Sequence, residues 1–285
     1  MKDNQAQLNA AAFRLPAFDA DFILSDSMRG LRFQLEYAKA EELLRAWGVR
    51  STVVVFGSAR VASGDVIDAR GADASPSRPR RAAPRQTSRS VHWYHEARRF
   101  ARIVSERGGA LTPVDGIRDN VIATGGGPGI MEAANRGAYD AGAPSIGFNI
   151  ALPHEQEPNA YSTPDLTFQF HYFAMRKMHF AMRAAALVAF PGGFGTFDEL
   201  FEILNLAETG KMPKVPVICF DSSYWKRVVN FDLLVEEGMI SPEELGLFSF
   251  SDDAEAAWDA LVAGGLRIPP AQPGTGLARQ TTGLP

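Results

Sequence analysis

The strongest chemical signal in the chain is the run PGGFGTFDE at residues 191–199. It follows the apolar run LVAF and precedes a periodic apolar segment, which predicts the order strand, glycine loop, helix. Gly192, Gly193 and Gly195 allow a ligand to approach the backbone closely, and a helix start directs unpaired N–H groups and a positive dipole end toward it. We therefore expect an anion at this loop, most simply a phosphate.

A second loop of the same kind is GGGPGIME at residues 125–132, which follows the run NVIAT. Its glycines include Gly127 and Gly129, and it too opens a predicted helix. Because the carboxyl ends of parallel strands share one edge of a sheet, two such loops predict one shared cleft. A structural alternative exists for the loop named first. Thr196 and Glu199 have the spacing of a capping box, in which Glu199 only reaches back to the Thr196 N–H.

Hydroxyl and charged side chains stand at two further points of the predicted sheet. Ser58 and Arg60 follow the β-branched run TVVVF and can meet a phosphate or a base, the alternative being an ordinary turn with a solvated arginine. Arg176 and Lys177 fall in the first turn of a predicted helix, where cations oppose the helix dipole. Pairing with a carboxylate or a phosphate explains their placement, whereas local helix stability does not.

The two glycine loops, with Met175-Arg176-Lys177 between them, resemble the Lonely Guy (LOG) family. The resemblance covers roughly residues 50–265, and the two loops together are specific where either alone is not. Members of this family were long labelled lysine decarboxylases and act as cytokinin riboside 5'-monophosphate phosphoribohydrolases. The segment LPHEQEPN at residues 152–159 resembles the longer bacterial branch of the family.

The resemblance implies hydrolysis of the N-glycosidic bond of a nucleoside 5'-monophosphate, such as AMP or a cytokinin riboside monophosphate, giving free base and ribose 5-phosphate. It implies two catalytic residues: Glu199 stabilises the sugar cation or activates water, and Arg176 orients Glu199 or the substrate. Glu132 would hold ribose hydroxyls, or else compensate the dipole of its helix. The residues expected to bind the phosphate or nucleotide are Ser58, Arg60, Gly127, Gly129, Glu132, Lys177, Gly192, Gly193, Gly195 and Thr196.

Other functions fit parts of the pattern. A non-catalytic nucleotide or molybdenum-cofactor carrier would keep the glycine loops without needing Arg176 and Glu199. Lysine decarboxylation would require pyridoxal phosphate on a Schiff-base lysine, and Lys177 has no such setting. NAD is disfavoured because residues 125–130 do not spell GxGxxG, and nucleoside triphosphate hydrolysis lacks its GxxxxGK[ST] motif. No cofactor is expected.

The family resemblance also implies a homodimer or a larger assembly of dimers, with the helix that bears Arg176 near the interface.

Composition narrows the classes of partner and compartment. The 285 residues, 46% of them hydrophobic, suffice for one large core, and the net charge of -4 gives no electrostatic case for a nucleic-acid partner. The single cysteine, Cys219, lies in an apolar run and is expected to be a buried, inert thiol. The five histidines form no metal-spaced set, so no metal is expected. Without a signal peptide or a run long enough to span a membrane, a cytoplasmic location is expected.

Strands alternate with predicted helices through residues 51–263, which predicts a single α/β domain: a Rossmann-like doubly wound parallel sheet with an N-terminal helical extension. The expected parts are an arm and helix at 1–49, the catalytic domain at 50–268 and a tail at 269–285. Composition predicts disorder in that tail and in an insertion at 62–90. Among the predicted helices are 27–47, 174–186 and 224–237.

Overall fold

One seven-stranded parallel sheet organises the protein. The structure, a computed structural model, describes residues 3–63, 87–152 and 157–270. In this part of the chain the strand order is β4-β3-β2-β1-β5-β6-β7, with every pair of neighbours parallel. The strands are β1 (Thr52–Phe56), β2 (Val121–Thr124), β3 (Ser145–Ile150), β4 (Thr167–Phe170), β5 (Ala184–Ala189), β6 (Val217–Phe220) and β7 (Ser249–Ser251). The predicted doubly wound parallel sheet is confirmed.

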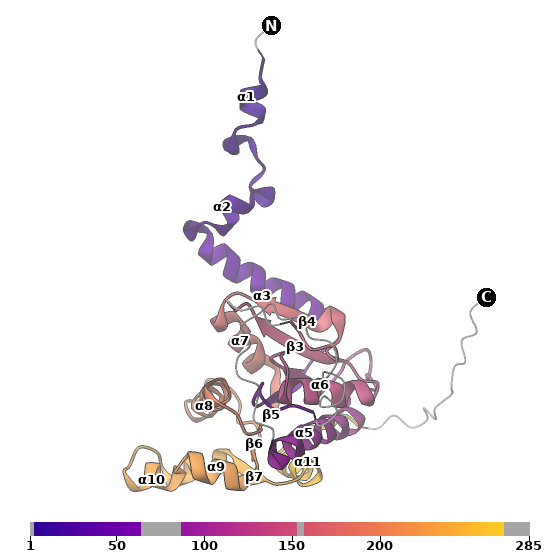
Figure 1. Ribbon diagram of the computed structural model, residues 1–285, viewed down its shortest axis with the longest axis vertical. Coiled ribbons are helices and arrows are strands. Elements are labelled where there is room, and N and C mark those ends of the chain that lie inside the picture. Colours follow the sequence, from indigo (N-terminus) through magenta and orange to yellow (C-terminus); the bar gives the residue numbers. More distant parts are fainter. Residues whose placement is uncertain (1–2, 64–86, 153–156, 271–285) are drawn as a thin grey trace, which may run out of the picture.

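Helices cover both faces of the sheet (Figure 1). The main helices are α3 (Arg29–Ala46), α5 (Ser88–Arg107), α6 (Ile130–Asp140), α7 (Phe173–Arg183), α8 (Phe194–Glu208), α9 (Ser222–Val228), α10 (Phe231–Glu236) and α11 (Ala254–Ala263). One apolar core lies between the sheet and α5, α6 and α11, and a second lies between the sheet and α3, α7, α8 and α9. The inner strands β1, β2 and β6 are buried on both faces, which explains their largely apolar sequences, whereas the edge strands β4 and β7 each keep an exposed residue.

The central strand β1 shows how the sequence produces this arrangement. All five of its residues are buried, and its β-branched side chains suit a pleated strand. Successive side chains point to opposite faces, so Val53 and Val55 join the first core while Val54 and Phe56 join the second. Strands β2 to β4 extend from one side of β1 and strands β5 to β7 from the other. The order in which strands are added to the sheet thus reverses between β1 and β5. Open α/β sheets bind ligands at such a switch point.

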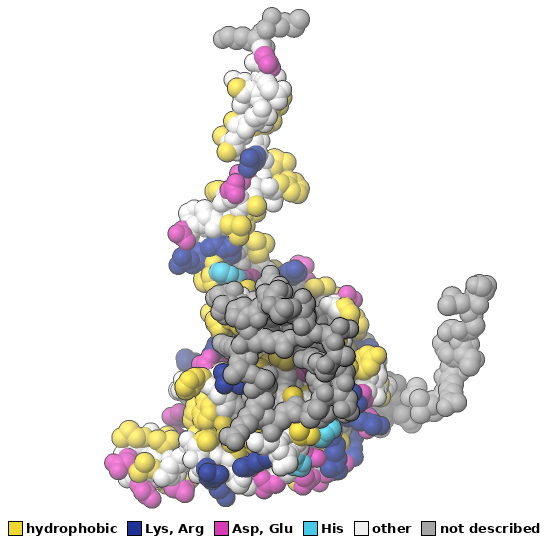
Figure 2. Space-filling model, viewed as in Figure 1, with side chains coloured by type: hydrophobic (Ala, Val, Ile, Leu, Met, Phe, Trp, Pro, Cys, Tyr) yellow, Lys and Arg dark blue, Asp and Glu magenta, His cyan; other side chains and the backbone are white. Residues whose placement is uncertain are grey.

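The N-terminal segment forms an arm that projects away from the sheet, as Figure 1 shows. Its short helices are α1 (Gln5–Leu8), η1 (Ala11–Phe13), η2 (Pro16–Phe18), α2 (Ala20–Leu24) and η3 (Asp26–Met28), and none contains a buried residue. Hydrophobic side chains stand along it in Figure 2. The helix predicted at 27–47 is α3, and Arg32 in its second turn holds the base of the arm through hydrogen bonds to the carbonyls of Ile23 and Ser25.

Two predicted helices are wrong in extent. The helix expected at 174–186 ends at Arg183, because the following alanines pair with β1 and begin β5. Alanine favours helices, so local propensity concealed the start of this strand. The helix expected at 224–237 is two helices, α9 and α10, separated at Val229 and Asn230. The Asn230 side chain accepts a hydrogen bond from the Leu233 N–H and caps α10 as a new helix.

The insertion predicted at 62–90 also needs correction at both ends. Ser63 is buried, and Thr87 caps α5 in a capping box with Ser90, so residues 62, 63 and 87–90 belong to the fold. Residues 64–86 lie outside the described residues, as does the tail from 271 onward. Two further η segments are η4 (Pro164–Leu166) and η5 (Pro242–Leu247).

Cys219 is a buried free thiol, as predicted, and burial raises its pKa to about 12. Its sulfur is therefore protonated at neutral pH and unreactive. No helix within residues 3–63, 87–152 and 157–270 is long and apolar enough to cross a membrane.

Candidate active site

Three loops meet at the carboxyl edge of the sheet, because β1 lies between β2 and β5. The turn after β1 bridges the other two. The Ser58 N–H donates to the carbonyl of Pro191 at 3.0 Å, and the Ser58 carbonyl accepts from the Ile130 N–H at 3.1 Å. The two glycine loops, which are more than sixty residues apart along the chain, are thereby held on either side of one turn. This supports the single cleft expected at the switch point of the sheet.

The loop after β5 presents a row of unused backbone donors. Helix α8 begins at Phe194 with Gly193 as its N-cap and no side chain capping it. The N–H groups of residues 192–195 donate to no acceptor in the part of the chain that the structure describes. A Cβ added at Gly193 or Gly195 would meet open space, so packing does not require glycine at either position. Unpaired amides at a helix start, with room in front of them, suit a phosphate.

The loop after β2 is held mainly by its own surroundings. The Gly126 N–H donates to Thr124 Oγ1 at 2.9 Å, and Asn159 donates from its backbone to the Gly126 carbonyl and from its side chain to the Gly127 carbonyl. Gly129, at φ 75°, lies so close to the Ser58 backbone that any side chain would collide with it. The glycines of this loop therefore serve backbone packing more than the glycines after β5 do.

Glu199 does not form the capping box that its spacing with Thr196 allows. The Thr196 N–H donates to the Gly193 carbonyl at 2.9 Å, and Glu199 lies a full turn further along α8 than a capping residue. The side chain of Thr196 instead packs against Gly192, where any Cβ would collide with it. The capping interpretation is wrong, and the placement of Glu199 needs another explanation.

Glu199 is a buried carboxylate without a hydrogen-bond donor. The residue is 5% exposed, and no described residue donates a hydrogen bond to it. Its oxygens nevertheless keep contact with solvent, because neither is among the fully buried, unpartnered polar atoms. Burial raises the pKa of Glu199 to about 7, although the nearby cations of Lys177 and Arg176 act to lower it. A buried carboxylate poised near neutrality is a strong candidate for catalysis.

Arg176 lies between the loop after β2 and Glu199. Its Nε donates to the Phe148 carbonyl at 2.8 Å, and its guanidinium packs against Gly125 and over the Phe180 ring. Burial lowers its pKa, while the carboxylates of Glu199 and Asp198 oppose that shift. Arg176 is thus a largely buried cation that acts on Glu199 electrostatically, without a direct ion pair between them.

Lys177, the neighbour of Arg176, is engaged by carboxylates of α8. Its Nζ lies 2.8 Å from Asp198 Oδ2 and 3.3 Å from Glu202 Oε2. Burial would lower the pKa of Lys177, but these acidic side chains outweigh it and raise the pKa. This carboxylate pairing explains a cation in the first turn of α7. A role for Lys177 in binding the nucleotide remains a prediction.

Glu132, Ser58 and Arg60, which were also predicted for the site, lie in different surroundings. Tyr94 donates from its hydroxyl to Glu132 Oε1 at 2.9 Å, and burial raises the pKa of Tyr94 to about 12. Glu132 is therefore oriented from the core side while it sits in the first turn of α6. Ser58 Oγ accepts from the Arg60 N–H at 3.1 Å, and the Arg60 side chain is exposed. The structure thus brings Ser58 between the loops without fixing Arg60 on them.

Several residues that support the site carry no signal in the sequence. Asn135 accepts from Thr124 Oγ1 and from Asn159 Nδ2, which ties α6 to the strand end and to the segment after β3. Tyr224 of α9 donates to the Gly192 carbonyl at 2.5 Å. Their partners lie far away along the chain, so spacing could not reveal them.

Within the described residues there is no group of three or more His, Cys, Asp or Glu side chains placed to hold a metal.

Comparisons with known proteins show which family this chain resembles. Residues 131–261 match the family model described as "Possible lysine decarboxylase", the old label of the LOG proteins. A probable cytokinin riboside 5'-monophosphate phosphoribohydrolase LOG of Oryza sativa subsp. japonica is 30% identical over 138 residues. A cytokinin riboside 5'-monophosphate phosphoribohydrolase LOG of Arabidopsis thaliana is 29% identical over 126 residues. The resemblance to the LOG family is confirmed.

These matches cover only part of each protein. The alignment with the rice LOG protein takes in 47% of this chain and 59% of that protein, and the Arabidopsis alignment takes in 43% and 57%. Among solved structures, the Moco carrier protein from Chlamydomonas reinhardtii is 20% identical with a TM-score of 0.42, covering 75% of this chain and 98% of the carrier. A likeness at that level carries no argument about activity.

The open space in front of Gly193 yields a direct test of the phosphate position. Gly193→Ala should fold normally, because the new Cβ meets no atom within 4 Å and the backbone φ of −102° suits alanine. If a phosphate occupies that space, the methyl group displaces it, and AMP affinity should fall by about tenfold or more. Isothermal titration with AMP measures this.

Gly30→Ala is the matched control for this substitution, because Gly30 on α3 also faces open space and lies far from the loops. Its AMP affinity should equal that of the wild type. Unchanged AMP affinity in Gly193→Ala would show that the phosphate does not bind at this loop.

Proposed function

We propose that this chain hydrolyses the N-glycosidic bond of nucleoside 5'-monophosphates, with AMP or a cytokinin riboside 5'-monophosphate as substrate. The observation that carries the proposal is the buried, donor-free carboxylate of Glu199 one turn and a half into the helix whose first amides are unpaired. The amides supply an anchor for a phosphate, and the carboxylate supplies negative charge a short distance from it. An N-glycosidase acting on a nucleotide needs both.

In the proposed reaction the phosphate binds at residues 192–195, away from the bond that breaks. As the bond between C1' and the base lengthens, positive charge develops on the ribose ring, and the carboxylate of Glu199 stabilises it or removes a proton from the attacking water. The water oxygen bonds to C1', and the base leaves with a proton. Lys177 and Arg176 hold Glu199 partly ionised through their charges, and Glu132 binds the ribose hydroxyls.

Substitution of the carboxylate separates this proposal from a carrier function. Glu199→Gln keeps the shape of the side chain but has no charge for a sugar cation and is a poor base, so release of adenine from AMP should fall by roughly 100-fold or more. AMP affinity should change little. The assay incubates the pure protein with AMP, CMP, GMP and isopentenyl-AMP and quantifies free base and ribose 5-phosphate.

The control is Glu208→Gln, at the exposed end of the same helix, which should keep full turnover. Near-normal turnover in Glu199→Gln would refute the role of Glu199. Tight AMP binding without turnover in the wild type, in Glu199→Gln and in Glu208→Gln alike would instead support a non-catalytic nucleotide carrier.

The raised pKa of Glu199 predicts the pH profile of the reaction. The carboxylate is protonated below its pKa of about 7 and charged above it, so kcat/KM for AMP should rise with pH through about 7 and then level off. The phosphate of AMP titrates near pH 6 as well. The profile of Glu199→Gln, which retains only the phosphate ionisation, is therefore the control. A rate that falls as pH rises through 7 would show that Glu199 acts as an acid, contrary to this mechanism.

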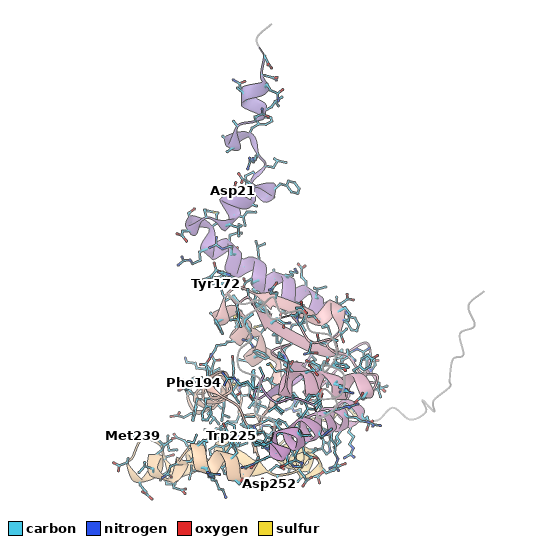
Figure 3. All side chains as sticks on the ribbon, in the orientation of Figure 1. Asp21, Tyr172, Phe194, Trp225, Met239 and Asp252 are labelled. Atoms are coloured by element: carbon cyan, nitrogen blue, oxygen red, sulfur yellow. The ribbon has the colours of Figure 1, made fainter. Side chains whose placement is uncertain are left out.

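We also propose that the chain forms a homodimer through the face made by α7 and α8. Four large apolar side chains of this face are exposed: Phe173, Met182, Phe194 and Phe201. Phe194, at 96% exposure, stands at the outer start of α8 (Figure 3). A pocket of about 740 Å³ lies against the same helix, lined by aromatic and aliphatic side chains together with charged ones such as Lys177 and Glu202. Contiguous exposed apolar surface of this kind marks an interface.

Light scattering at micromolar concentration should give at least twice the mass of one 31.0 kDa chain. Met182→Asp places a charge in the proposed interface and should shift the protein toward the monomer, because an unpaired charge is costly to bury. Val262→Asp, at a comparably exposed position on α11, should leave the mass unchanged. A monomeric wild type would contradict the dimer.

A further inference from the structure

A tyrosine outside both glycine loops bonds to the backbone of one of them. The hydroxyl of Tyr224 donates to the carbonyl of Gly192 at 2.5 Å. In a trans peptide the carbonyl and the following N–H point in opposite directions, and the described chain contains no cis peptide. With the Gly192 carbonyl held on Tyr224, the Gly193 N–H must point away from it. That N–H belongs to the row of amides at residues 192–195 that have no acceptor among the described residues.

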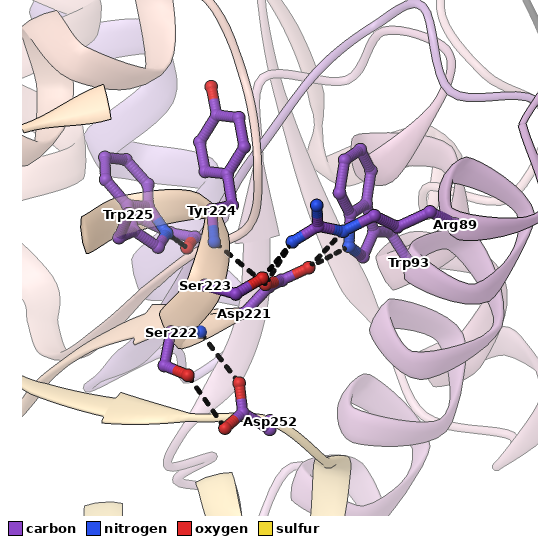
Figure 4. A network of polar contacts seen from close by, with 9 residues as sticks. Arg89, Trp93, Asp221, Ser222, Ser223, Tyr224, Trp225 and Asp252 are labelled. Atoms are coloured by element: carbon purple, nitrogen blue, oxygen red, sulfur yellow. Dashed lines mark hydrogen bonds and ion pairs between the residues drawn. The ribbon is translucent and has the colours of Figure 1, made fainter. Parts of the chain in front are cut away.

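Tyr224 is held in turn by the carboxylate of Asp221 (Figure 4). Asp221 accepts hydrogen bonds from the Tyr224 N–H at 3.0 Å, from Arg89 Nε at 3.0 Å and Nη2 at 2.7 Å, and from Trp93 Nε1 at 2.7 Å. Burial would raise the pKa of Asp221, but these donors outweigh it and lower the pKa to about 2. Asp221 is therefore ionised at neutral pH and joins the start of α5 to the start of α9.

The ring of Tyr224 is fixed independently of its hydroxyl. It packs edge-on against Trp93, with ring centroids 5.9 Å apart, and against Trp225 at 5.5 Å. Trp225 is itself anchored by a hydrogen bond from Nε1 to the Ala189 carbonyl at the end of β5. Burial raises the pKa of Tyr224, so its hydroxyl is a proton donor at neutral pH. Phenylalanine at this position would keep the packing and lose only the hydrogen bond.

We propose that Tyr224 is a positioning residue for the phosphate: its hydroxyl orients the Gly192–Gly193 peptide so that the Gly193 N–H faces the ligand. Asp221 and Arg89 hold Tyr224 in place for this task. The proposal rests on the proposed function, because it assigns the phosphate of the substrate to residues 192–195. A purely structural hydrogen bond to the Gly192 carbonyl would support the stability of the fold without affecting phosphate binding in particular.

The test is Tyr224→Phe, assayed in the full-length protein with AMP. Loss of one hydrogen bond that orients the anchor should raise KM by about five- to tenfold. The phosphate is bound equally in the ground state and the transition state, so kcat should stay within about twofold. Inorganic phosphate, as a competitive inhibitor, should weaken by the same factor as AMP. Tyr139→Phe, an exposed tyrosine on α6, is the matched control and should change neither constant.

Equal KM and equal phosphate inhibition in Tyr224→Phe and the wild type would overturn the proposal, as would a fall in kcat alone. If the wild type shows no turnover, the proposed function fails and the positioning role is measured by calorimetric titration with AMP. Weaker AMP binding in Tyr224→Phe then upholds the role, and equal binding overturns it.

Discussion

The rest of this site depends on one constraint: the carboxylate of Glu199 is buried without a hydrogen-bond donor from the described residues. Leaving Glu199 charged in its position is unfavourable, as its raised pKa shows, and only the cations of α7 oppose that penalty. The position persists because its neighbours on α8, Leu200 and Ile203, are buried in the core between the sheet and the helices. Packing energy of the fold thus holds a destabilised group beside the glycine loops. Such arrangements are typical of functional sites.

The two glycine loops look alike in sequence but act differently in the fold. The loop after β2 is held through the Gly126 N–H and through the carbonyls of Gly126 and Gly127, which accept from Asn159, and its Gly126 and Gly129 have no room for a side chain. The loop after β5 leaves its amides free, and the bonds that do hold it act on carbonyls: Tyr224 on Gly192 and Ser58 on Pro191. Fixing carbonyls on the protein side leaves amides for a ligand. The free amides and the carboxylate of Glu199 belong to one helix, so phosphate anchor and reactive charge keep a constant separation.

Much of the fold could be predicted from the sequence because its signals are local. The apolar β-branched run of β1 and the glycine-rich turns before α6 and α8 specify strands and helix starts within a few residues. Prediction failed where a distant partner overrides local preference. The alanines at the start of β5 have a helical propensity, but pairing with β1 places them in a strand. Thr87 is the N-cap of α5, a role that its local sequence does not indicate. The spacing of Thr196 and Glu199 fits a capping box, yet the helix begins at Phe194, so Thr196 already lies inside it.

The supporting residues of the site could not be predicted for the same reason. Asp221 lies 132 residues from Arg89 in the chain, and Tyr224 lies 32 residues from Gly192. The sequence of the serine-rich turn after β6 does not indicate that a residue following it orients a peptide of another loop. The roles predicted for Arg176 and Glu199 came from family resemblance, and their burial and electrostatic coupling give those roles a physical basis.

The most direct measurement is a crystal structure of the Glu199→Gln variant soaked with AMP, since a slow variant leaves the substrate intact. The account predicts that phosphate oxygens accept hydrogen bonds from the amides of residues 192–195, and that C1' of the ribose lies beside residue 199 with the base beyond it. A phosphate bound at the loop after β2, or a ribose whose C1' is remote from residue 199, would contradict the account.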